Sequence, residues 1–97
     1  MQVLVTYDIA DTDAPDGRRR LRRCAQACLN HGQRVQKSVF ECTVTDRTIL
    51  LLVAALEDII DPGKDSVRMY RLSPERDRLI HVLGVDTYRD PEAPLIV

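Results

Sequence analysis

Asp8 is a residue whose type and position could support metal chemistry in this 97-residue chain. It follows an apolar, β-branched stretch and stands where that strand would emerge, so its carboxylate would be held on a rigid element and still meet solvent. One carboxylate makes a poor magnesium site, but a two-fold axis that placed two copies of Asp8 side by side would provide a second ligand. The structural alternative is a strand-end aspartate that only begins a turn.

A dense run of arginine is the second chemical feature. Five of the 14 basic residues fall within the six positions Arg18-Arg19-Arg20-Leu21-Arg22-Arg23. On a helix they would project around Leu21, and guanidinium groups suit phosphate oxygens because they offer paired donors and stay charged. The alternative is a solvated helix face whose charge is neutralised by Asp11, Asp13 and Asp16. No aromatic residue interleaves the run, so base stacking is not expected there.

The sulfur and imidazole groups favour structural roles. Cys24, Cys28 and Cys42 are an odd number of cysteines, which argues against a disulfide framework. With His31 they could be imagined as a zinc site, but no tight C-x-x-C pair anchors one, so small buried apolar residues are the favoured interpretation. His81 stands in an apolar segment, where a satisfied side chain is more common than a catalytic one. The sequence contains no nucleophile motif, phosphate-binding loop or dinucleotide fingerprint.

The composition is typical of one globular domain. Hydrophobic residues make up 44% of the chain and charged residues 30%, and the net charge of -1 does not select a class of partner. The N-terminus lacks the basic region of a signal peptide. The longest apolar run, residues 49–56, is too short to cross a membrane. We therefore expect a cytoplasmic protein without a membrane partner.

Hydrophobic patterning predicts a strand and a helix around the first two features. Residues 3–9 are apolar on both faces and predict a central strand. A helix should follow over about residues 16–31, with Asp16 as its N-cap and Gly32 as its stop. This helix would bury one stripe, formed by Leu21, Cys24, Ala25, Cys28 and Leu29.

The second half of the chain predicts further elements of both kinds. Residues 33–45 indicate either a short hairpin that turns near Lys37-Ser38 or one long bent strand, and the pattern leaves both open. Residues 46–61 contain a run that could be a strand, but apolar spacing over three turns favours a helix. Residues 66–72 predict a strand, and residues 76–86 a weaker, extended segment.

This order of elements predicts an α+β fold, a ferredoxin-like sandwich (βαββαβ) with an additional C-terminal strand, in a single domain over residues 1–97. An antiparallel sheet with both helices on one face accommodates the order. A lone sheet of this size has open edges, which proteins usually cover, so we expect a homodimer. Residues 79–97 form a C-terminal extension expected to pair across the dimer. Its apolar end, Pro94-Leu95-Ile96-Val97, is expected to dock.

Four segments of the chain carry a family resemblance. They are Tyr7-Asp8-Ile9, the run Gly32-Gln33-Arg34-Val35-Gln36-Lys37-Ser38-Val39-Phe40-Glu41-Cys42, the break Ile60-Asp61-Pro62, and Asp65-Ser66-Val67-Arg68-Met69-Tyr70-Arg71-Leu72. In matching order, over about residues 1–83, they resemble the CRISPR-associated Cas-two family. The second segment is the most specific. It departs from the family at Lys37, where an aromatic residue is common.

The resemblance implies a ferredoxin-like homodimer in which Asp8 binds Mg²⁺ or Mn²⁺ at the dimer cleft. It also implies a catalytic set of Asp8, Arg20, Arg34 and Phe40. The alignment of the helix could shift by one turn, so the choice among its arginines, Arg22 and Arg23 included, stays open. The implied nucleic-acid-binding residues are Arg18, Arg19, Arg20, Arg22, Arg23, Arg34 and Lys37.

For function, the resemblance implies a CRISPR antiviral protein of spacer acquisition that binds nucleic acid as a homodimer. In the family this goes with metal-dependent endonuclease activity, the hydrolysis of RNA or DNA, here through Asp8. The alternative is a non-catalytic adaptor that bridges Cas-one integrase dimers. No general base stands out, so both roles stay open, with Cas-one, double-stranded DNA and single-stranded RNA as implied partners. A ferredoxin-like small-molecule regulatory domain is a more remote alternative.

Overall fold

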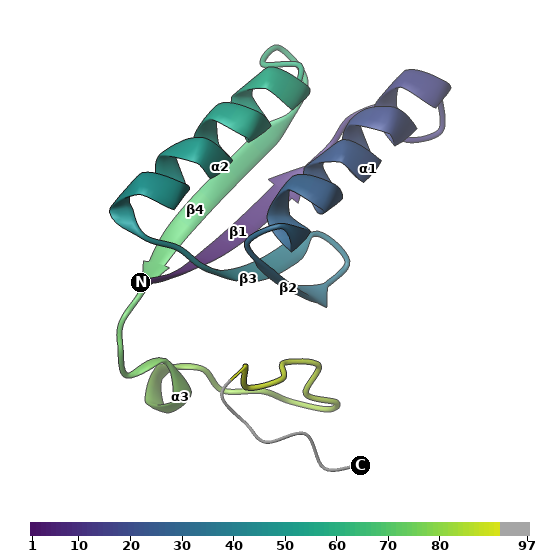
Figure 1. Ribbon diagram of the computed structural model, residues 1–97. Helices are drawn as coiled ribbons and strands as arrows, with labels where there is room; N and C mark the ends of the chain where they lie inside the picture. Colours follow the sequence, from purple (N-terminus) through teal and green to yellow (C-terminus); the bar gives the residue numbers. More distant parts are fainter. Residues whose placement is uncertain (92–97) are drawn as a thin grey trace.

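The computed structural model describes residues 1–91. Along the chain it contains β1 (Gln2–Asp8), α1 (Pro15–Leu29), β2 (Gly32–Gln36), β3 (Val39–Thr43), α2 (Asp46–Ile59), β4 (Ser66–Leu72) and the short α3 (Arg76–Leu79). The strands form one antiparallel four-stranded sheet with the order β2-β3-β1-β4. Both long helices cover the same face of this sheet (Figure 1). The predicted α+β, ferredoxin-like sandwich is confirmed.

The two ambiguous segments are resolved. The chain after α1 forms a hairpin, β2 and β3, that turns at Lys37-Ser38, and a bulge lies between Arg34 and Gln36 in β2. The segment 46–59 is helical as predicted, and Thr45 caps it through a reciprocal pair of hydrogen bonds with Thr48. The helix predicted from the length and the apolar spacing of this segment is confirmed.

The core lies between the helices and the inner face of the sheet. Every second residue of β1, at positions 3, 5 and 7, is buried against the helices, because alternate side chains of a strand point to opposite faces. The largest fully buried side chains are Phe40, Leu52, Val3, Val5, Cys24, Cys28 and Cys42. The sheet therefore presents Leu4, Thr6 and Asp8 of β1 on its other face, away from the helices.

The cysteines are core residues, as predicted. All three are free and buried, and burial raises the pKa of Cys24 to about 11, so its thiol stays neutral. The Cys42 Sγ donates a hydrogen bond to the Cys28 carbonyl oxygen over 3.6 Å. Within residues 1–91 no group of three or more His, Cys, Asp or Glu side chains is placed to hold a metal ion. The zinc alternative therefore has no support in this part of the chain.

The predicted ends of the first helix were wrong. Ala14 is the N-cap and Pro15 opens α1, since proline suits a first turn whose N–H groups have no helical partner. Asp16 lies inside the first turn and accepts hydrogen bonds from Arg19 and Arg20. The helix ends at Asn30 without a glycine stop. Gly32 instead begins β2, where a Cβ would lie only 2.2 Å from the Glu41 carbonyl oxygen.

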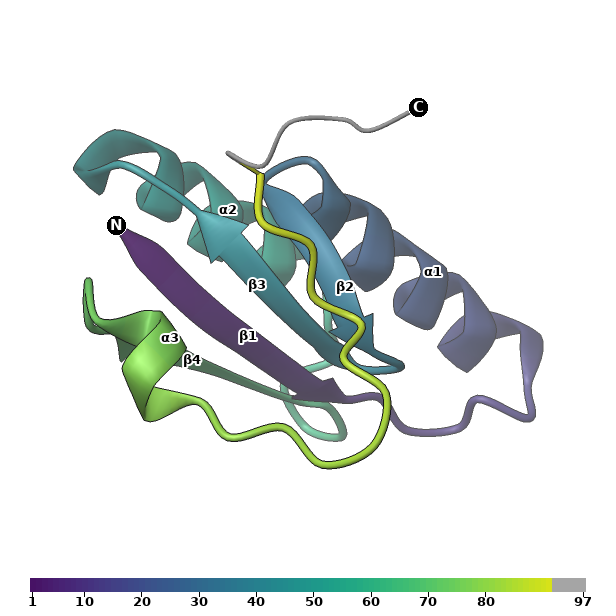
Figure 2. The ribbon, with the colours of Figure 1, turned by 90° about the horizontal axis from the view of Figure 1, so that it is seen from below.

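The segment after β4 crosses the face of the sheet that the helices leave open (Figure 2). It contains the single turn of α3 and then irregular chain, so the extended structure expected over 76–86 was wrong at its start. No additional strand is present among residues 73–91, and the apolar tail 94–97 lies outside the described residues. No helix in the described part of the chain is both long and apolar enough to cross a membrane.

Candidate functional site

Asp8 is the last residue of β1 and its side chain is exposed. It shares the open face of the sheet with Leu4 and Thr6, and Ser66 of β4 is its cross-strand partner. A carboxylate at this place can reach solvent while its backbone is fixed in the sheet ladder. The structure thus places the Asp8 carboxylate in solvent at the end of a rigid strand, as the sequence analysis expected.

One chain does not complete a metal site around Asp8. Since residues 1–91 offer no cluster of three or more potential ligands, the other oxygens must come from water, from nucleic acid or from a second copy of the chain. Two Asp8 carboxylates related by a two-fold axis fit a magnesium-type ion, which accepts few protein carboxylates and retains several waters. A second copy of Asp8 would therefore improve the fit of this site to such an ion.

Arg20 is placed differently from the phosphate-binding role expected for it. Its side chain is 9% exposed, and its Nε and Nη2 atoms donate to Asp65 over 2.8 and 3.4 Å. Nη1 donates to Asp16 over 2.6 Å, and Nη2 also reaches the Ala10 carbonyl oxygen over 3.1 Å. These partners occupy the guanidinium, because a phosphate oxygen would have to displace carboxylates that are already well aligned. Arg20 therefore joins α1 to the neighbouring loops.

Asp65 is a further residue of this site, and the sequence analysis did not predict a site role for it. Its side chain is fully buried at the end of the loop before β4, and it accepts hydrogen bonds from the Ala10 and Asp61 N–H groups and from Arg20. Burial alone would raise the pKa of Asp65. The hydrogen bonds from Arg20, Asp61 and Ala10 outweigh burial and hold this pKa below its ordinary value of 3.8.

The shifted pKa of Asp65 predicts a loss of stability in acid. Because the folded-state pKa lies below the unfolded value, the carboxylate stabilises the fold above about pH 4, and this contribution disappears as pH falls through the folded pKa. Urea unfolding at pH 7, 4 and 3 should show that Asp65→Asn is less stable at pH 7 and loses less stability on acidification than the wild type. An Asp13→Asn control should follow the wild type. Parallel curves for Asp65→Asn and the wild type would contradict the assignment.

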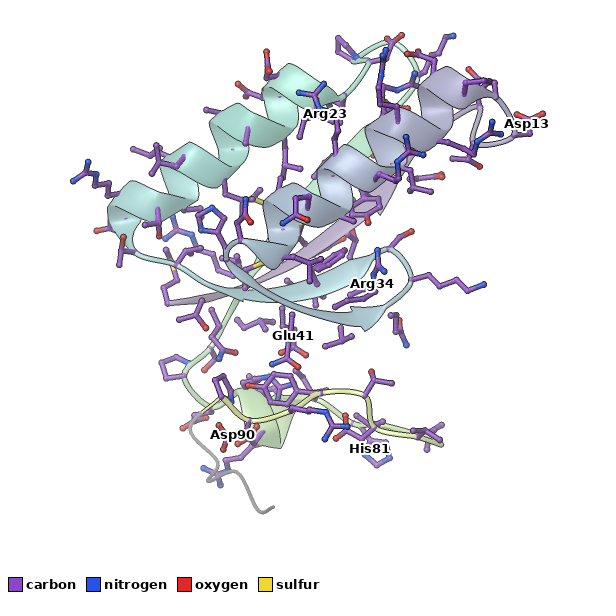
Figure 3. All side chains as sticks on the ribbon, turned by 45° about the vertical axis from the view of Figure 1, so that its right-hand side comes forward. Asp13, Arg23, Arg34, Glu41, His81 and Asp90 are labelled. Carbon is purple, nitrogen blue, oxygen red and sulfur yellow. The ribbon has the colours of Figure 1, made fainter. Side chains whose placement is uncertain are left out.

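The other four arginines of α1 are exposed. Arg18 donates to the Asp13 carbonyl oxygen over 2.8 Å, and Arg19 pairs with Asp16 over 2.8 Å. Arg23 extends from α1 toward α2 and approaches Asp58 at 3.8 Å (Figure 3). Arg22 makes no ion pair with any residue of the described chain. These contacts lie in water and hold the side chains weakly, so the guanidinium groups remain available to another anion.

Phe40 is not a surface aromatic residue. It is completely buried, and its ring supports two side chains of the site: Tyr7 stacks on it at 5.8 Å between ring centroids, and Arg34 lies 5.1 Å above it. Burial raises the pKa of Tyr7, an effect that the nearby Arg34 opposes. The Tyr7 hydroxyl is buried and has no hydrogen bond of ordinary geometry within residues 1–91. Phe40 therefore positions its neighbours and does not stack on a base.

Arg34 and Lys37 are exposed on the hairpin, and Figure 3 shows Arg34 at the hairpin below α1. They line one wall of an open cavity of about 570 Å³ whose other residues are Leu21, Val35, Gln36, Ser38 and Thr87. No carboxylate belongs to this lining. The hairpin therefore adds positive charge next to that of α1.

A buried ion pair holds the C-terminal segment against the open face of the sheet. Glu41 of β3 accepts two hydrogen bonds from Arg76, of which the Nη2–Oε2 contact is 2.7 Å, and this pairing raises the pKa of Arg76. Glu41 points away from the helices toward this segment (Figure 3). The Arg76 guanidinium also lies 3.4 Å from the ring centroid of Tyr88. The sequence interpretation missed this pair, since nothing in the pattern links positions 35 residues apart.

Comparisons with known proteins identify relatives over the whole chain. Residues 1–79 match the family model of CRISPR associated protein Cas2. The chain is 43% identical to a CRISPR-associated endoribonuclease Cas2 of Moorella thermoacetica, with all of both chains covered. It is 47% identical to one from Rhodospirillum rubrum, with 98% of this chain and 99% of the relative covered.

Solved structures show the same similarity. The crystal structure of Streptococcus pyogenes Cas2 is 48% identical in sequence and superimposes with a TM-score of 0.80, covering 87% of this chain and all of the other. A hypothetical protein from Thermus thermophilus is 32% identical, with a TM-score of 0.73 and coverage of 88% and 92%. The family resemblance found in the sequence is thereby confirmed, and the similarity covers at least 92% of each of these relatives. The chain belongs to the CRISPR-associated Cas2 protein family.

Proposed function

We propose that this protein acts in CRISPR spacer acquisition as a homodimer that binds nucleic acid through α1 and cleaves it with a divalent metal held by Asp8. The observation that carries the proposal is that one arginine of α1 is buried whereas the others are exposed. Arg20 is buried and holds the helix in place, whereas its four neighbours, Arg18, Arg19, Arg22 and Arg23, are exposed. Relatives are named endoribonuclease or endonuclease, which supports a nuclease activity.

Nucleic-acid binding would rest on the exposed arginines and on the hairpin. Guanidinium groups bind phosphate oxygens through paired donors, without regard to base sequence. Arg34 and Lys37 would extend the same positive surface beyond α1. The buried Phe40 leaves no aromatic platform at this place, so we expect the protein to recognise the backbone and not the bases.

Cleavage would need two chains, because each contributes a single carboxylate. Asp8 of both copies would hold Mg²⁺ or Mn²⁺, and a bound metal would polarise the scissile phosphate and lower the pKa of a bound water. Arg34 lies on the hairpin with its guanidinium over the Phe40 ring, and it would add positive charge that holds the bound strand. The edge strands β2 and β4 offer backbone groups for pairing with the second copy.

The arginine surface predicts the salt dependence of binding. Replacing Arg19, Arg22 and Arg23 with Gln should weaken binding of duplex DNA of any sequence. The slope of log K against log salt should shrink by roughly 0.9 for each phosphate that the variant no longer neutralises, or about 2.7 for three phosphates. Fluorescence anisotropy measures this slope when the binding constant is determined at salt concentrations from about 50 to about 300 mM.

The control for this experiment is Arg47→Gln, which removes an exposed arginine at the start of α2. It should leave the slope unchanged, since it lies away from the proposed surface. If the triple variant keeps the wild-type slope, α1 does not contact phosphate, and its arginines are only a solvated face.

The second candidate function is that of an adaptor without catalysis that bridges Cas-one integrase dimers. It is favoured because residues 1–91 contain no group of three or more His, Cys, Asp or Glu side chains placed to hold a metal ion. An adaptor needs only binding surfaces, which α1 and the sheet edges provide. Spacer integration with Cas-one and the Asp8→Asn protein separates the two functions: an adaptor keeps integrating, whereas a required nuclease does not.

A further inference from the structure

The chain turns sharply immediately after Asp8. Asp11, three residues further on, has a φ of 57°, in the left-handed region that few residues other than glycine adopt. The Ala14 N–H closes the turn on the Asp11 carbonyl oxygen at 2.9 Å. A turn of this kind persists where surrounding groups fix it, and such over-determined turns are frequent next to functional residues.

The peptide groups of Ala10 are held on both sides. The Ala10 N–H donates to Asp65 Oδ1 over 2.9 Å, and the Ala10 carbonyl oxygen accepts from Arg20 Nη2 over 3.1 Å. Arg20 and Asp65 are themselves joined by the 2.8 Å contact of Nε with Oδ2. The segment two residues beyond Asp8 is therefore clamped between α1 and the loop before β4.

Close packing of α1 reinforces this clamp. A Cβ built on Gly17 would lie 2.1 Å from the Asp11 carbonyl oxygen and 2.5 Å from that of Ala10. These are backbone atoms, so only glycine permits the contact. Asp65 also directly precedes Ser66, which pairs with Asp8 across the sheet. The buried carboxylate of Asp65 thus fixes both strands at the end where Asp8 emerges.

We infer that Asp65 is a positioning residue for the metal site, fixing the direction in which Asp8 leaves the sheet. The inference rests on the proposed function of Asp8 and deepens it. A carboxylate suits the task because it accepts hydrogen bonds from two backbone N–H groups and from Arg20 at once. An asparagine of the same shape would turn an NH₂ group toward one of these donors. The Asp65 side chain is itself fully buried, so it would act through Asp8 and its strand.

The test compares Asp65→Asn with Asp61→Asn, which makes the same change of charge in the same loop but at a side chain that bonds Gly63 and not Ala10, Arg20 or Asp65. Amide hydrogen exchange should be at least about tenfold faster at Ala10 in Asp65→Asn, and unchanged at Val5 in the middle of β1. Titration with Mn²⁺, followed by paramagnetic broadening of the Asp8 and Ser66 amide signals, reports metal binding without any cleavage. Its half-point should rise about 10- to 100-fold in Asp65→Asn, the usual effect of losing a residue that orients a metal ligand.

Each outcome has a defined meaning. Faster exchange at Ala10 together with a raised Mn²⁺ half-point supports the positioning role, provided that Asp61→Asn matches the wild type. Faster exchange with an unchanged half-point overturns it and leaves Asp65 as a structural residue only. If the wild-type protein shows no broadening near Asp8, the metal site itself is wrong, and the positioning role fails with it. Rescue of cleavage by excess Mn²⁺ in Asp65→Asn, but not in Asp8→Asn, is the expected companion result.

Discussion

An Asp8→Asn variant is expected to lose metal-dependent cleavage by at least about 100-fold while it keeps its fold. The amide is a much poorer ligand for a hard cation than the carboxylate, and the loss falls on the one acidic side chain proposed to hold the metal. The side chain is exposed at the end of β1, so the melting temperature should change little. Cleavage of labelled RNA and DNA, measured beside circular dichroism melting, checks both parts.

Asp13→Asn is the matched control, since it removes an exposed carboxylate from the loop that follows β1. It should cleave like the wild type. Asp8→Asn protein that cleaves as fast as the wild type would show that the activity comes from a contaminant or from another site. The same Asp8→Asn preparation, combined with Cas-one, is the sample for the integration assay that separates enzyme from adaptor.

Replacing Phe40 with Ala is expected to lower the free energy of unfolding by roughly 3–5 kcal/mol, which is a large part of the stability of a small domain. The ring is 0% exposed and packs against Tyr7 and Arg34. Its loss leaves a cavity under the hairpin that carries Arg34 and Lys37. Urea unfolding measures the change.

Two controls assign the effect to the core. Leu50→Ala, at a leucine that is 68% exposed on α2, should change the free energy of unfolding by less than about 0.5 kcal/mol. Arg34→Gln should weaken nucleic-acid binding with little loss of stability, because its side chain is exposed. Wild-type stability in Phe40→Ala, with binding abolished, would mean that Phe40 contacts nucleic acid directly.

Most of the fold was predictable because the spacing of apolar residues along the sequence differs between strands and helices. The burial of alternate residues in β1 and the helical spacing within 46–59 reflect one buried face for each element. Element ends were less predictable. The N-cap at Ala14 depends on the proline that follows it, and Gly32 is required by its close approach to Glu41 and not by a helix stop.

The site was predictable only where its residues are exposed. Asp8 and four arginines of α1 lie on the surface, as their types and positions indicated. Arg20 and Phe40 were also expected to contact a ligand, but both are buried. Arg20 pairs with Asp65, and Phe40 packs against Tyr7 and Arg34. A run of five similar arginines does not reveal which member will face a buried carboxylate.

The C-terminal segment was the least predictable part of the described chain. Its place on the open face depends on the pairing of Glu41 with Arg76 and on the stacking of Tyr88 on that guanidinium. Side-chain pairs between distant positions leave no periodic signal. The pairing of residues 79–97 across a dimer stays a prediction.

The decisive measurement is the number of Mn²⁺ ions bound per chain at equilibrium, read beside sedimentation of the same sample. A metal shared by two Asp8 carboxylates predicts a dimer that binds one ion for every two chains, and Asp8→Asn dimers that bind none at the same concentration. One ion for each chain, or equal binding by Asp8→Asn, would contradict the shared site.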